Sequence, residues 1–216
     1  MLNGIFFRPP LEANWLGHQF SEIYKDKIFA PFLNGKKDLT IVDIGANVGN
    51  FSYYASQFAK KVYALEPSLE HFQVLTHMLE FNKLTDIVVP INKAIYMQSG
   101  RFEFHHNANR TMYSLHTAVD DKSSNPELVL AITLEDLFKE HNIEHVDLMK
   151  LDIEGSEHEV VSSPSFKAVA PKISTIVIEY HQWSGRHPNQ LNEALKNNGF
   201  RVSVMPSSAD IIVGQR

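Results

Sequence analysis

The chain has 216 residues, of which 44% are hydrophobic and 21% are charged, and its formal net charge at pH 7 is -5. This composition is typical of one globular domain large enough to bury a full core. The negative charge argues against a nucleic-acid partner, which needs a basic face, and the absence of cysteine excludes disulfides, zinc–thiolate sites and iron–sulfur clusters. No apolar run approaches the roughly 18 residues of a membrane span, and the N-terminus lacks the pattern of a secretion signal, so we expect a cytoplasmic protein.

Residues 1–38 precede the first predicted strand and are rich in aromatic side chains. These are Phe6, Phe7, Trp15, Phe20, Tyr24, Phe29 and Phe32. We interpret the segment as a helical appendage packed on the sheet, because aromatic side chains contribute large apolar areas to a core. A cap over a binding site, or an oligomer interface such as that of a homodimer, is the functional alternative.

The stretch 39–49, LTIVDIGANVG, is the most informative part of the chain. A strand predicted over Thr40–Ile44 is followed by a turn that begins at Gly45 and ends at Gly49, and a helix is expected over Asn50–Ala59. Glycine lets the backbone approach a ligand closely, because it has no Cβ atom. The pattern therefore predicts a cofactor loop, and a tight strand–helix turn without a ligand is the alternative.

The second predicted strand, Val62–Leu65, ends in an acidic residue, Glu66, 21 residues after Gly45. In dinucleotide-binding proteins an acid at this place holds the hydroxyls of a ribose. The turn differs from the dinucleotide fingerprint, however, because Asn47 stands where the second glycine should be, and the carboxylate of Asp43 would repel a pyrophosphate. The same carboxylate suits an ammonium group, so these residues favour S-adenosylmethionine (SAM) over a nicotinamide dinucleotide.

Strand and helix patterns alternate along the rest of the chain. The predicted elements after Glu66 are a helix over Ser68–Asn82, strands over Ile87–Asn92, Val146–Asp152 and Ser174–Tyr180, a helix over Pro188–Asn198, and strands over Phe200–Met205 and Asp210–Val213. The last two should form an antiparallel hairpin, because turn-forming residues 206–208 join them. Ser156 and Glu159 have the spacing of a capping box, which predicts the start of a helix. The alternation implies an α/β fold with a mostly parallel sheet and helices on both faces.

Residues 100–130 do not fit this alternation. The segments GRFEF and LVLAI resemble strands, and a polar connection rich in turn-forming residues runs between them. So long a connection is more often functional than idle, and we interpret it as a mobile substrate loop. His105 and His106, at its start, are second-rank candidates for a catalytic role.

Residues 150–157, KLDIEGSE, form the second chemical motif, at the carboxyl end of a predicted strand. Alternate side chains of an extended chain share a face, so Lys150, Asp152 and Glu154 should point the same way. Ligands of open α/β sheets bind beyond the carboxyl ends of the strands, close to the first strand of the sheet. We expect the strand that carries this motif to lie next to that first strand, so the cluster would lie beside the reactive end of the cofactor. The alternative is structural: Lys150 pairs with a carboxylate, and Glu157 favours a helix N-terminus.

His181 follows the strand that we expect next to this motif, and a histidine can titrate near neutrality. We therefore consider His181, Asp152 and Glu154 as the candidate catalytic residues that could take a proton. Asp152 with Glu179 or His181 could also hold a divalent ion. A simple ion pair explains the same residues, and we do not favour a metal.

Five segments of the chain resemble one protein family: VDIGANVGNFS, ALEPS, NKAI, MKLDIEGSE and IVIEYH. The family is that of the FkbM SAM-dependent methyltransferases, and the resemblance spans residues 39–182. It implies a class I methyltransferase fold, which is a Rossmann-like three-layer sandwich. The seven-stranded, mostly parallel sheet of this fold has the order 3-2-1-4-5-7-6, and its C-terminal strand is antiparallel. The implied activity is transfer of a methyl group to a hydroxyl of a small molecule, such as a sugar or a polyketide.

The motifs and the resemblance together give a set of expected cofactor-binding residues. These are Asp43, Gly45, Ala46, Asn47, Gly49, Asn50, Phe51, Glu66, Pro67, Asn92, Ala94 and Asp152. The methyltransferase domain is expected over 39–216, with the substrate loop as an insertion at about 100–130 and residues 1–38 as an appendage. Three alternatives stay open: a methyltransferase that acts on protein or RNA, a dehydrogenase that binds a nicotinamide dinucleotide, and a SAM-binding module without catalytic activity.

Overall fold

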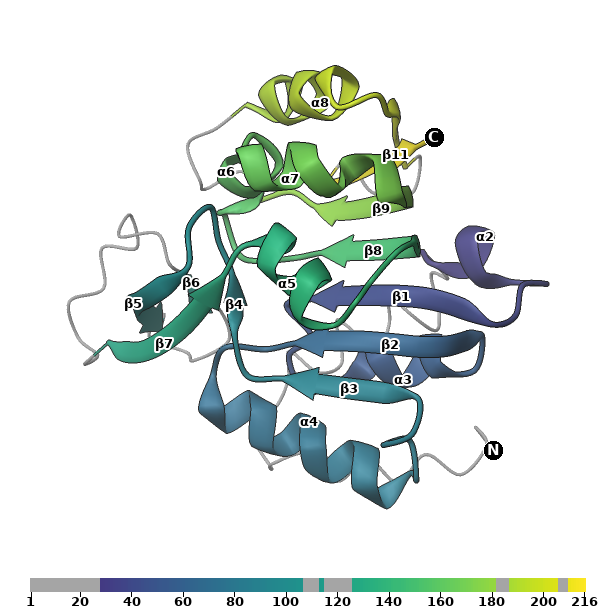
Figure 1. Cartoon of the computed structure of the whole chain (residues 1–216), viewed down its shortest axis with the longest axis vertical. Helices are drawn as coiled ribbons and strands as arrows, with labels where there is room; N and C mark the ends of the chain where they lie inside the picture. Colours follow the sequence, from purple (N-terminus) through teal and green to yellow (C-terminus); the bar gives the residue numbers. More distant parts are fainter. Residues whose placement is uncertain (1–27, 107–112, 115–125, 182–186, 206–209) are drawn as a thin grey trace.

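The structure, a computed structural model of the chain, describes residues 28–106, 113–114, 126–181, 187–205 and 210–216. Its centre is a seven-stranded sheet (Figure 1). Along the sheet, the strands are β10 (Arg201–Val204), β11 (Ile211–Gln215), β9 (Ile173–Glu179), β8 (Val146–Leu151), β1 (Leu39–Ile44), β2 (Ala59–Leu65) and β3 (Val88–Ile91). The strands from β9 to β3 are parallel, and β11 is antiparallel to both its neighbours. This is the order 3-2-1-4-5-7-6 that the resemblance implies, so the expected Rossmann-like α/β fold is confirmed.

Helices cover both faces of the sheet, and a cluster of buried side chains fills each layer between helices and strands. One face carries α2 (Ala30–Leu33), α3 (Asn50–Ser56) and α4 (Leu69–Phe81). The other carries α5 (Leu134–Glu140), α6 (Glu157–Val161), α7 (Pro164–Val169), a 3-10 turn over Ala170–Lys172, and α8 (Pro188–Asn197). Phe51 and Leu75 are buried in the first layer, and Phe166 and Leu191 in the second. Among the described residues, no helix has the length and apolar character that crossing a membrane requires.

Two helices, α5 and α7, lie in stretches without a predicted element. Each begins with a side-chain cap, in which the hydroxyl of Thr133 accepts from the amide of Asp136 and the hydroxyl of Ser163 accepts from the amide of Phe166, both at 3.1 Å. A cap of this kind stabilises a helix by about 0.5–2 kcal/mol. The sequence therefore contained an indication of both helix starts, namely a threonine at 133 and a serine at 163, each able to cap the amide three residues later.

The capping box predicted at Ser156 is wrong, although α6 does begin there. Ser156 has φ -97° and ψ 9° rather than the extended conformation of a capping hydroxyl, and it makes no side-chain cap. Its hydroxyl has no hydrogen-bond partner among the described residues. The carboxylate of Glu157 instead accepts from the amides of Ile153 (3.2 Å) and Gly155 (3.0 Å), and so stabilises the turn before the helix.

A second sheet stands at the carboxyl ends of the parallel strands (Figure 1). Its strands, in spatial order, are β4 (Ala94–Ile95), β7 (Glu127–Ile132), β5 (Gly100–His106) and β6 (Tyr113–Ser114). The two strands predicted within residues 100–130 are thus confirmed, as the antiparallel partners β5 and β7. Phe104, Val129 and Ala131 form a small buried core in this sheet. The connection expected to be a mobile substrate loop lies mostly outside the described residues.

The described end of the N-terminal segment packs on the main core. The ring centroids of Phe29 and Phe51 lie 4.3 Å apart, and Leu33 is fully buried. Residues 1–27 lie outside the described part of the chain, so the assignment of the segment as an appendage, a cap or a dimer interface stays a prediction. The C-terminal hairpin is confirmed by the pairing of β10 with β11, although its turn at 206–208 also lies outside the described residues.

Candidate active site

The loop after β1 lies directly against the carboxyl end of β8. Gly45 has a φ of 77°, and a Cβ atom there would lie 1.7 Å from the carbonyl oxygen of Asp152, so only glycine fits. The amides of Gly45 and Ala46 both donate to the carbonyl oxygen of Leu65, at 3.0 and 2.8 Å. These contacts hold the loop between the ends of β8 and β2.

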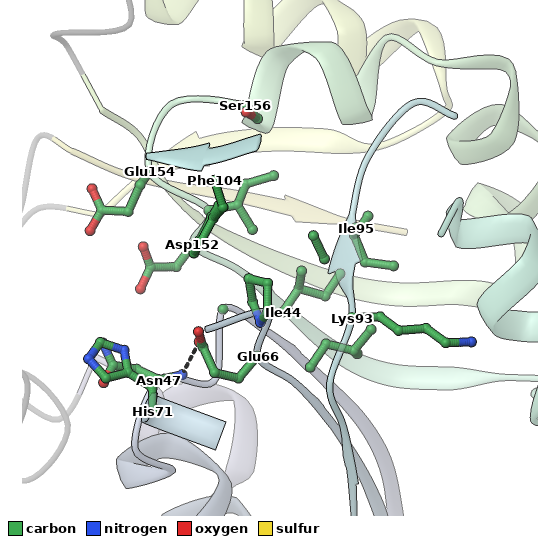
Figure 2. A pocket seen from close by; sticks show the side chains of 15 residues that line it. Ile44, Asn47, Glu66, His71, Lys93, Ile95, Phe104, Asp152, Glu154 and Ser156 are labelled. Atoms are coloured by element: carbon green, nitrogen blue, oxygen red, sulfur yellow. Dashed lines mark hydrogen bonds between the residues drawn. The ribbon is translucent and has the colours of Figure 1, made fainter. Parts of the chain in front are cut away.

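The acid at the end of β2, Glu66, lies beside this loop and is 5% exposed. One of its carboxylate oxygens accepts from the amide of Asn47 at 2.8 Å (Figure 2), and the other accepts from the amide of Ser68 at 2.9 Å. The side chain of Asn92 supports this turn by donating to the carbonyl oxygens of Glu66 and Pro67. Burial raises the pKa of Glu66 to about 7, although the two backbone hydrogen bonds lower it. Because a carboxylate oxygen has two lone pairs, each oxygen can still accept from a hydroxyl of a ligand.

A buried ion-pair network lies beneath the loop, around Asp43 and Lys150. Asp43 is fully buried, and it accepts a hydrogen bond from the hydroxyl of Ser52 at 2.6 Å. The ammonium of Lys150 lies 3.5 Å from the Asp43 carboxylate and 3.1 Å from that of Asp152. It also donates to the carbonyl oxygen of Gly45, at 2.9 Å. Asp43, which we expected to face an ammonium group of the cofactor, thus lies under the loop and pairs with a lysine of the chain itself.

The surroundings disfavour the charged form of Asp43 and favour the charged form of Lys150. Burial raises the pKa of Asp43, and the charge of Lys150 only partly offsets this rise. Burial also disfavours the charged form of Lys150, but the carboxylates of Asp152 and Asp43 outweigh it and raise the lysine pKa. Lys150 is therefore a permanent cation at the centre of the site.

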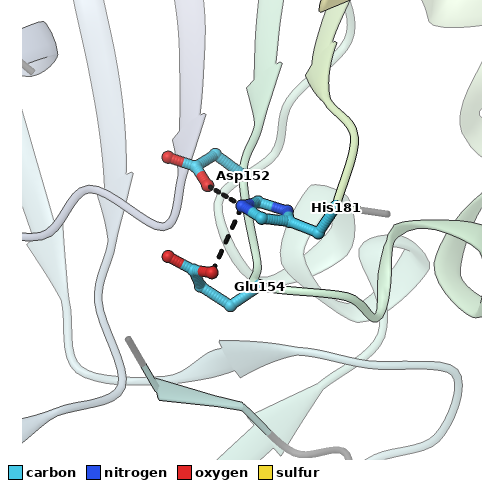
Figure 3. Close-up of side chains that lie close together, drawn as sticks. All are labelled: Asp152, Glu154 and His181. Atoms are coloured by element: carbon cyan, nitrogen blue, oxygen red, sulfur yellow. Dashed lines mark ion pairs between the residues drawn. The ribbon is translucent and has the colours of Figure 1, made fainter. Parts of the chain in front are cut away.

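The carboxyl ends of β8 and β9 bring the three candidate catalytic residues together (Figure 3). The Nε2 atom of His181 lies 3.2 Å from Oε2 of Glu154 and 3.9 Å from Oδ1 of Asp152. The preceding amide, that of Tyr180, donates to the carbonyl oxygen of Asp210 at 2.7 Å, which fixes the end of β9. The two strands thus present two carboxylates and an imidazole at one point.

A fourth side chain, Glu157, orients His181. It is 2% exposed, and its Oε1 atom lies 2.9 Å from Nδ1 of His181. Because the same oxygen accepts the amides of Ile153 and Gly155, the backbone fixes its position. Sequence reasoning assigned Glu157 only to the start of a helix, since nothing local in the sequence indicates a contact between residues 24 positions apart.

This cluster concentrates negative charge and holds protons tightly. Burial disfavours the charged form of His181, but the hydrogen bond with Glu157 and the charges of the surrounding carboxylates raise its pKa to about 10. Burial is the main cause that raises the pKa of Glu154 to about 8, against the charge of His181. The arrangement therefore favours positive charge at the point where the three side chains meet.

A pocket with an empty volume of about 610 Å³ opens between the loop after β1, the end of β8 and the small sheet. Glu66, Asp152 and Glu154 form part of its polar wall, and Ile95 and Phe104 part of its apolar wall (Figure 2). The small sheet thus closes one side of the pocket.

Half of the expected cofactor-binding residues line this pocket: Gly45, Asn47, Glu66, Pro67, Ala94 and Asp152. In the described structure, those that do not are Asp43, Ala46, Gly49, Asn50, Phe51 and Asn92. The lining also includes residues that we did not expect, namely Ile44, Leu65, His71, Lys93, Ile95, Phe104, Ile153 and Ser156. His181 reaches the pocket through its contacts with Asp152 and Glu154. The side chains of His105 and His106, on β5, lie outside the described part of the chain.

The comparisons with known proteins agree with this architecture. The sequence model of the methyltransferase FkbM domain matches residues 43–202, and no curated protein sequence matches the chain. Among solved structures, methyltransferase FkbM from Methylobacillus flagellatus has a TM-score of 0.60 and 16% identity, over 91% of this chain and 48% of that one. The chain thus spans about half the length of that protein.

Two further solved structures have a similar fold and were obtained with a cofactor or its product. SMU.1697c, a putative methyltransferase from Streptococcus mutans in complex with S-adenosylhomocysteine (SAH), has a TM-score of 0.55 and 12% identity, over 88% of this chain and 97% of that one. Magnesium protoporphyrin IX methyltransferase from Synechocystis, with bound SAM, has a TM-score of 0.55 and 14% identity, over 93% and 80%. At these identities the structures show the fold alone, whereas the family match covers most of the chain. The chain therefore belongs to the FkbM family of SAM-dependent methyltransferases.

Proposed function

We propose that the enzyme transfers the methyl group of SAM to a hydroxyl oxygen of a small molecule. The observation that carries this proposal is that Asp152 and Glu154 line the same pocket as Glu66. His181 contacts both Asp152 and Glu154. A ribose bound by Glu66 and a methionine portion against the loop after β1 would direct the methyl group of SAM toward the cluster of Asp152, Glu154 and His181.

The chemistry of the cluster suits an acceptor that loses a proton. Methyl transfer from a sulfonium is an in-line displacement, in which alignment of the acceptor oxygen, the methyl carbon and the sulfur supplies up to about 7–11 kcal/mol. A group that accepts the hydroxyl proton adds about 10²–10⁴-fold in rate. Asp152, Glu154 and His181 meet at one point. Because the raised pKa values of His181 and Glu154 keep a proton on each of them near neutral pH, we assign proton removal to the cluster as a whole and not to the imidazole alone.

Charge favours a small acceptor over RNA. The chain has a formal net charge of -5, and the acceptor side of the pocket carries carboxylates that would repel a phosphate backbone. Residues 1–38 and 100–130 would select the acceptor. These are the two segments that do not fit the alternation of strands and helices. The pocket wall at Phe104 supports this for the second segment.

Affinity for SAH should depend on pH through Glu66. Only the ionised carboxylate accepts hydrogen bonds from both ribose hydroxyls, and its pKa of about 7 means that most of it is protonated at pH 6 and ionised at pH 8. Lowering the pH from 8 to 6 should therefore weaken SAH binding roughly tenfold, since one proton must be displaced per ligand below the pKa. Isothermal titration calorimetry at a series of pH values measures this.

Glu66→Gln is the control for the pH dependence. The amide cannot titrate, so its SAH affinity should be lower than that of the parent at pH 8 and nearly flat between pH 6 and pH 8. An equally steep pH profile in Glu66→Gln would assign the dependence to another group and contradict the role of Glu66.

The proposed function is tested by following SAH formation with three kinds of methyl acceptor. Small alcohols, sugars and polyketide-like hydroxy compounds should support turnover, whereas RNA and protein should not. Methyl transfer to RNA or protein alone would overturn the proposal in favour of a macromolecular substrate. Calorimetry with NAD separates the dehydrogenase alternative, which requires that NAD binds in place of SAH.

A further inference from the structure

We propose that Asp152, Glu154 and His181 form a binding site for one divalent transition-metal ion next to the methyl acceptor. This inference deepens the proposed function, on which it rests, because the ion would contact the acceptor hydroxyl. One atom from each of the three side chains can be chosen so that all lie within 4.8 Å of one another (Figure 3). No other group of this kind is found among the described residues.

The separations of the ligand atoms suit a shared metal ion. Metal–nitrogen and metal–oxygen bonds of roughly 2.0–2.2 Å place adjacent ligand atoms about 3 Å apart and opposite ones about 4 Å apart. His181 Nε2 lies 3.2 Å from Glu154 Oε2 and 3.9 Å from Asp152 Oδ1. A single ion can therefore contact all three atoms after only small movements of the side chains.

The orientation of His181 is that of a metal ligand. Its Nδ1 atom faces the buried carboxylate of Glu157 at 2.9 Å, and Glu157 is in turn held by backbone amides. In metal sites a ligating histidine almost always donates its second ring N–H to a carboxylate or carbonyl, which fixes the tautomer and turns the other nitrogen toward the ion. Glu157 supplies this carboxylate, so Nε2 is directed at Asp152 and Glu154, where a bound metal ion would take the place of a proton on Nε2.

Glu154 gives an independent indication of a missing ligand. Its Oε2 atom is buried and forms no hydrogen bond within the described residues, although His181 Nε2 lies only 3.2 Å away. A simple ion pair at this distance would normally form a charge-assisted hydrogen bond. The backbone of Glu154 also has a φ of 54°, a conformation that is unfavourable for glutamate and that persists only where the surroundings impose it. Both observations are explained by a group between the two side chains.

The donor atoms indicate which ions would bind. One imidazole nitrogen and two carboxylate oxygens, without a thiolate, suit Mn²⁺, Fe²⁺ or Zn²⁺, whereas Ca²⁺ prefers oxygen ligands alone. Three protein ligands leave coordination positions open for the acceptor, as in catalytic metal sites. A hydroxyl bound there would be acidified and held in place for attack on the methyl group.

The test measures metal binding directly, without turnover. Protein treated with EDTA and then freed of it is titrated with MnCl₂, and free Mn²⁺ is followed by electron paramagnetic resonance, with ZnCl₂ and CaCl₂ titrated by calorimetry. We expect one Mn²⁺ or Zn²⁺ per chain and much weaker binding of Ca²⁺. The outcome that overturns the proposal is a parent protein that binds neither Mn²⁺ nor Zn²⁺ at one site.

Three variants locate the ion. Glu154→Gln removes a ligand from a partly exposed side chain, and it should lower Mn²⁺ affinity at least tenfold. Glu157→Gln should lower it by about 10–100-fold, the usual effect of changing the group that orients a ligating histidine. The matched control is Glu193→Gln, on the exposed surface of α8, which should bind Mn²⁺ like the parent. Parent-like binding in Glu154→Gln would overturn the assignment, whether or not Glu157→Gln folds.

SAH titration of the same samples keeps the two proposals apart. Protein that transfers methyl groups at the full rate after complete metal removal would refute a role of the ion at the acceptor and leave the proposed function standing. Protein that binds Mn²⁺ at the cluster but transfers no methyl group to any hydroxyl compound would refute the proposed function instead.

Discussion

Replacing Lys150 with methionine should lower the free energy of unfolding by about 3–5 kcal/mol, the usual cost of removing one partner from a buried ion pair. Methionine has a similar length, so the packing is kept while the charge is lost. The Asp43 carboxylate is fully buried, and without the ammonium 3.5 Å away its remaining partner among the described residues is the hydroxyl of Ser52. Urea denaturation followed by circular dichroism measures the change.

Two further variants show whether the uncompensated charge is the cause. Adding Asp43→Asn to Lys150→Met should recover much of the lost stability, because the fully buried carboxylate is then gone, while Asp152 still has His181 at 3.9 Å. Lys196→Met removes a lysine that is 54% exposed and pairs with Glu193 on the surface of α8, so it should change stability by no more than about 0.5 kcal/mol. If Lys150→Met and Lys196→Met lower the free energy of unfolding by similar amounts, the buried network beneath the loop contributes no more to stability than a surface ion pair.

His181→Ala should lower turnover by about 10²–10⁴-fold and leave SAH affinity nearly unchanged. His181 contacts Asp152 and Glu154 on the acceptor side of the pocket, whereas we assign the cofactor to the loop after β1 and to Glu66. Loss of the imidazole should therefore affect the chemical step and spare cofactor binding. Steady-state kinetics and SAH calorimetry on the same preparation separate the two effects.

His145→Ala is the matched control for this variant. His145 precedes β8 at the opposite end of the strand and is 54% exposed, so its loss should leave both turnover and SAH affinity near the parent values. A His181→Ala variant that turns over like the parent would remove His181 from the catalytic cluster. A large loss of SAH affinity would instead make it a cofactor residue.

The parts of the site that sequence reasoning placed correctly are those at strand ends. Glu66, Asp152 and His181 each follow an apolar strand, and the order of parallel strands brings such residues to one edge of the sheet. Strand periodicity and glycine turns are local signals, and the family resemblance supplied the order of the strands. Together they were sufficient to place these three side chains in the same region.

The parts that were missed depend on contacts across the fold. Lys150 was expected to pair with one carboxylate, but the packing of β1 against β8 sets it between Asp43 and Asp152. Glu157 was assigned to a helix start, whereas the register of β8 and β9 brings it to His181. No pattern in a single sequence contains these partners, because each belongs to a different element.

The pocket wall made by the small sheet was missed for a different reason. The sequence predicted β5 and β7 as strands, but alternation within a strand does not say which other sheet it faces. Phe104 is buried and lines the pocket. In the sequence it cannot be told from an ordinary core residue of an amphipathic strand. Its place at the carboxyl edge follows from β4, which continues directly from β3 and pairs with β7.

The position of β11 has a consequence for the order of folding. This strand is the furthest along the chain, yet it lies inside the sheet beside β9, and the amide of Tyr180 donates to Asp210 at its start. Until β11 docks, β9 has an unpaired edge next to the site, which is a hazard for association with other chains. Pairings between segments distant in sequence form slowly, because the intervening loop must close first. During refolding, methyl transfer should therefore appear later than helix content, because the active site is complete only after β1 has paired with β8 and β11 has paired with β9.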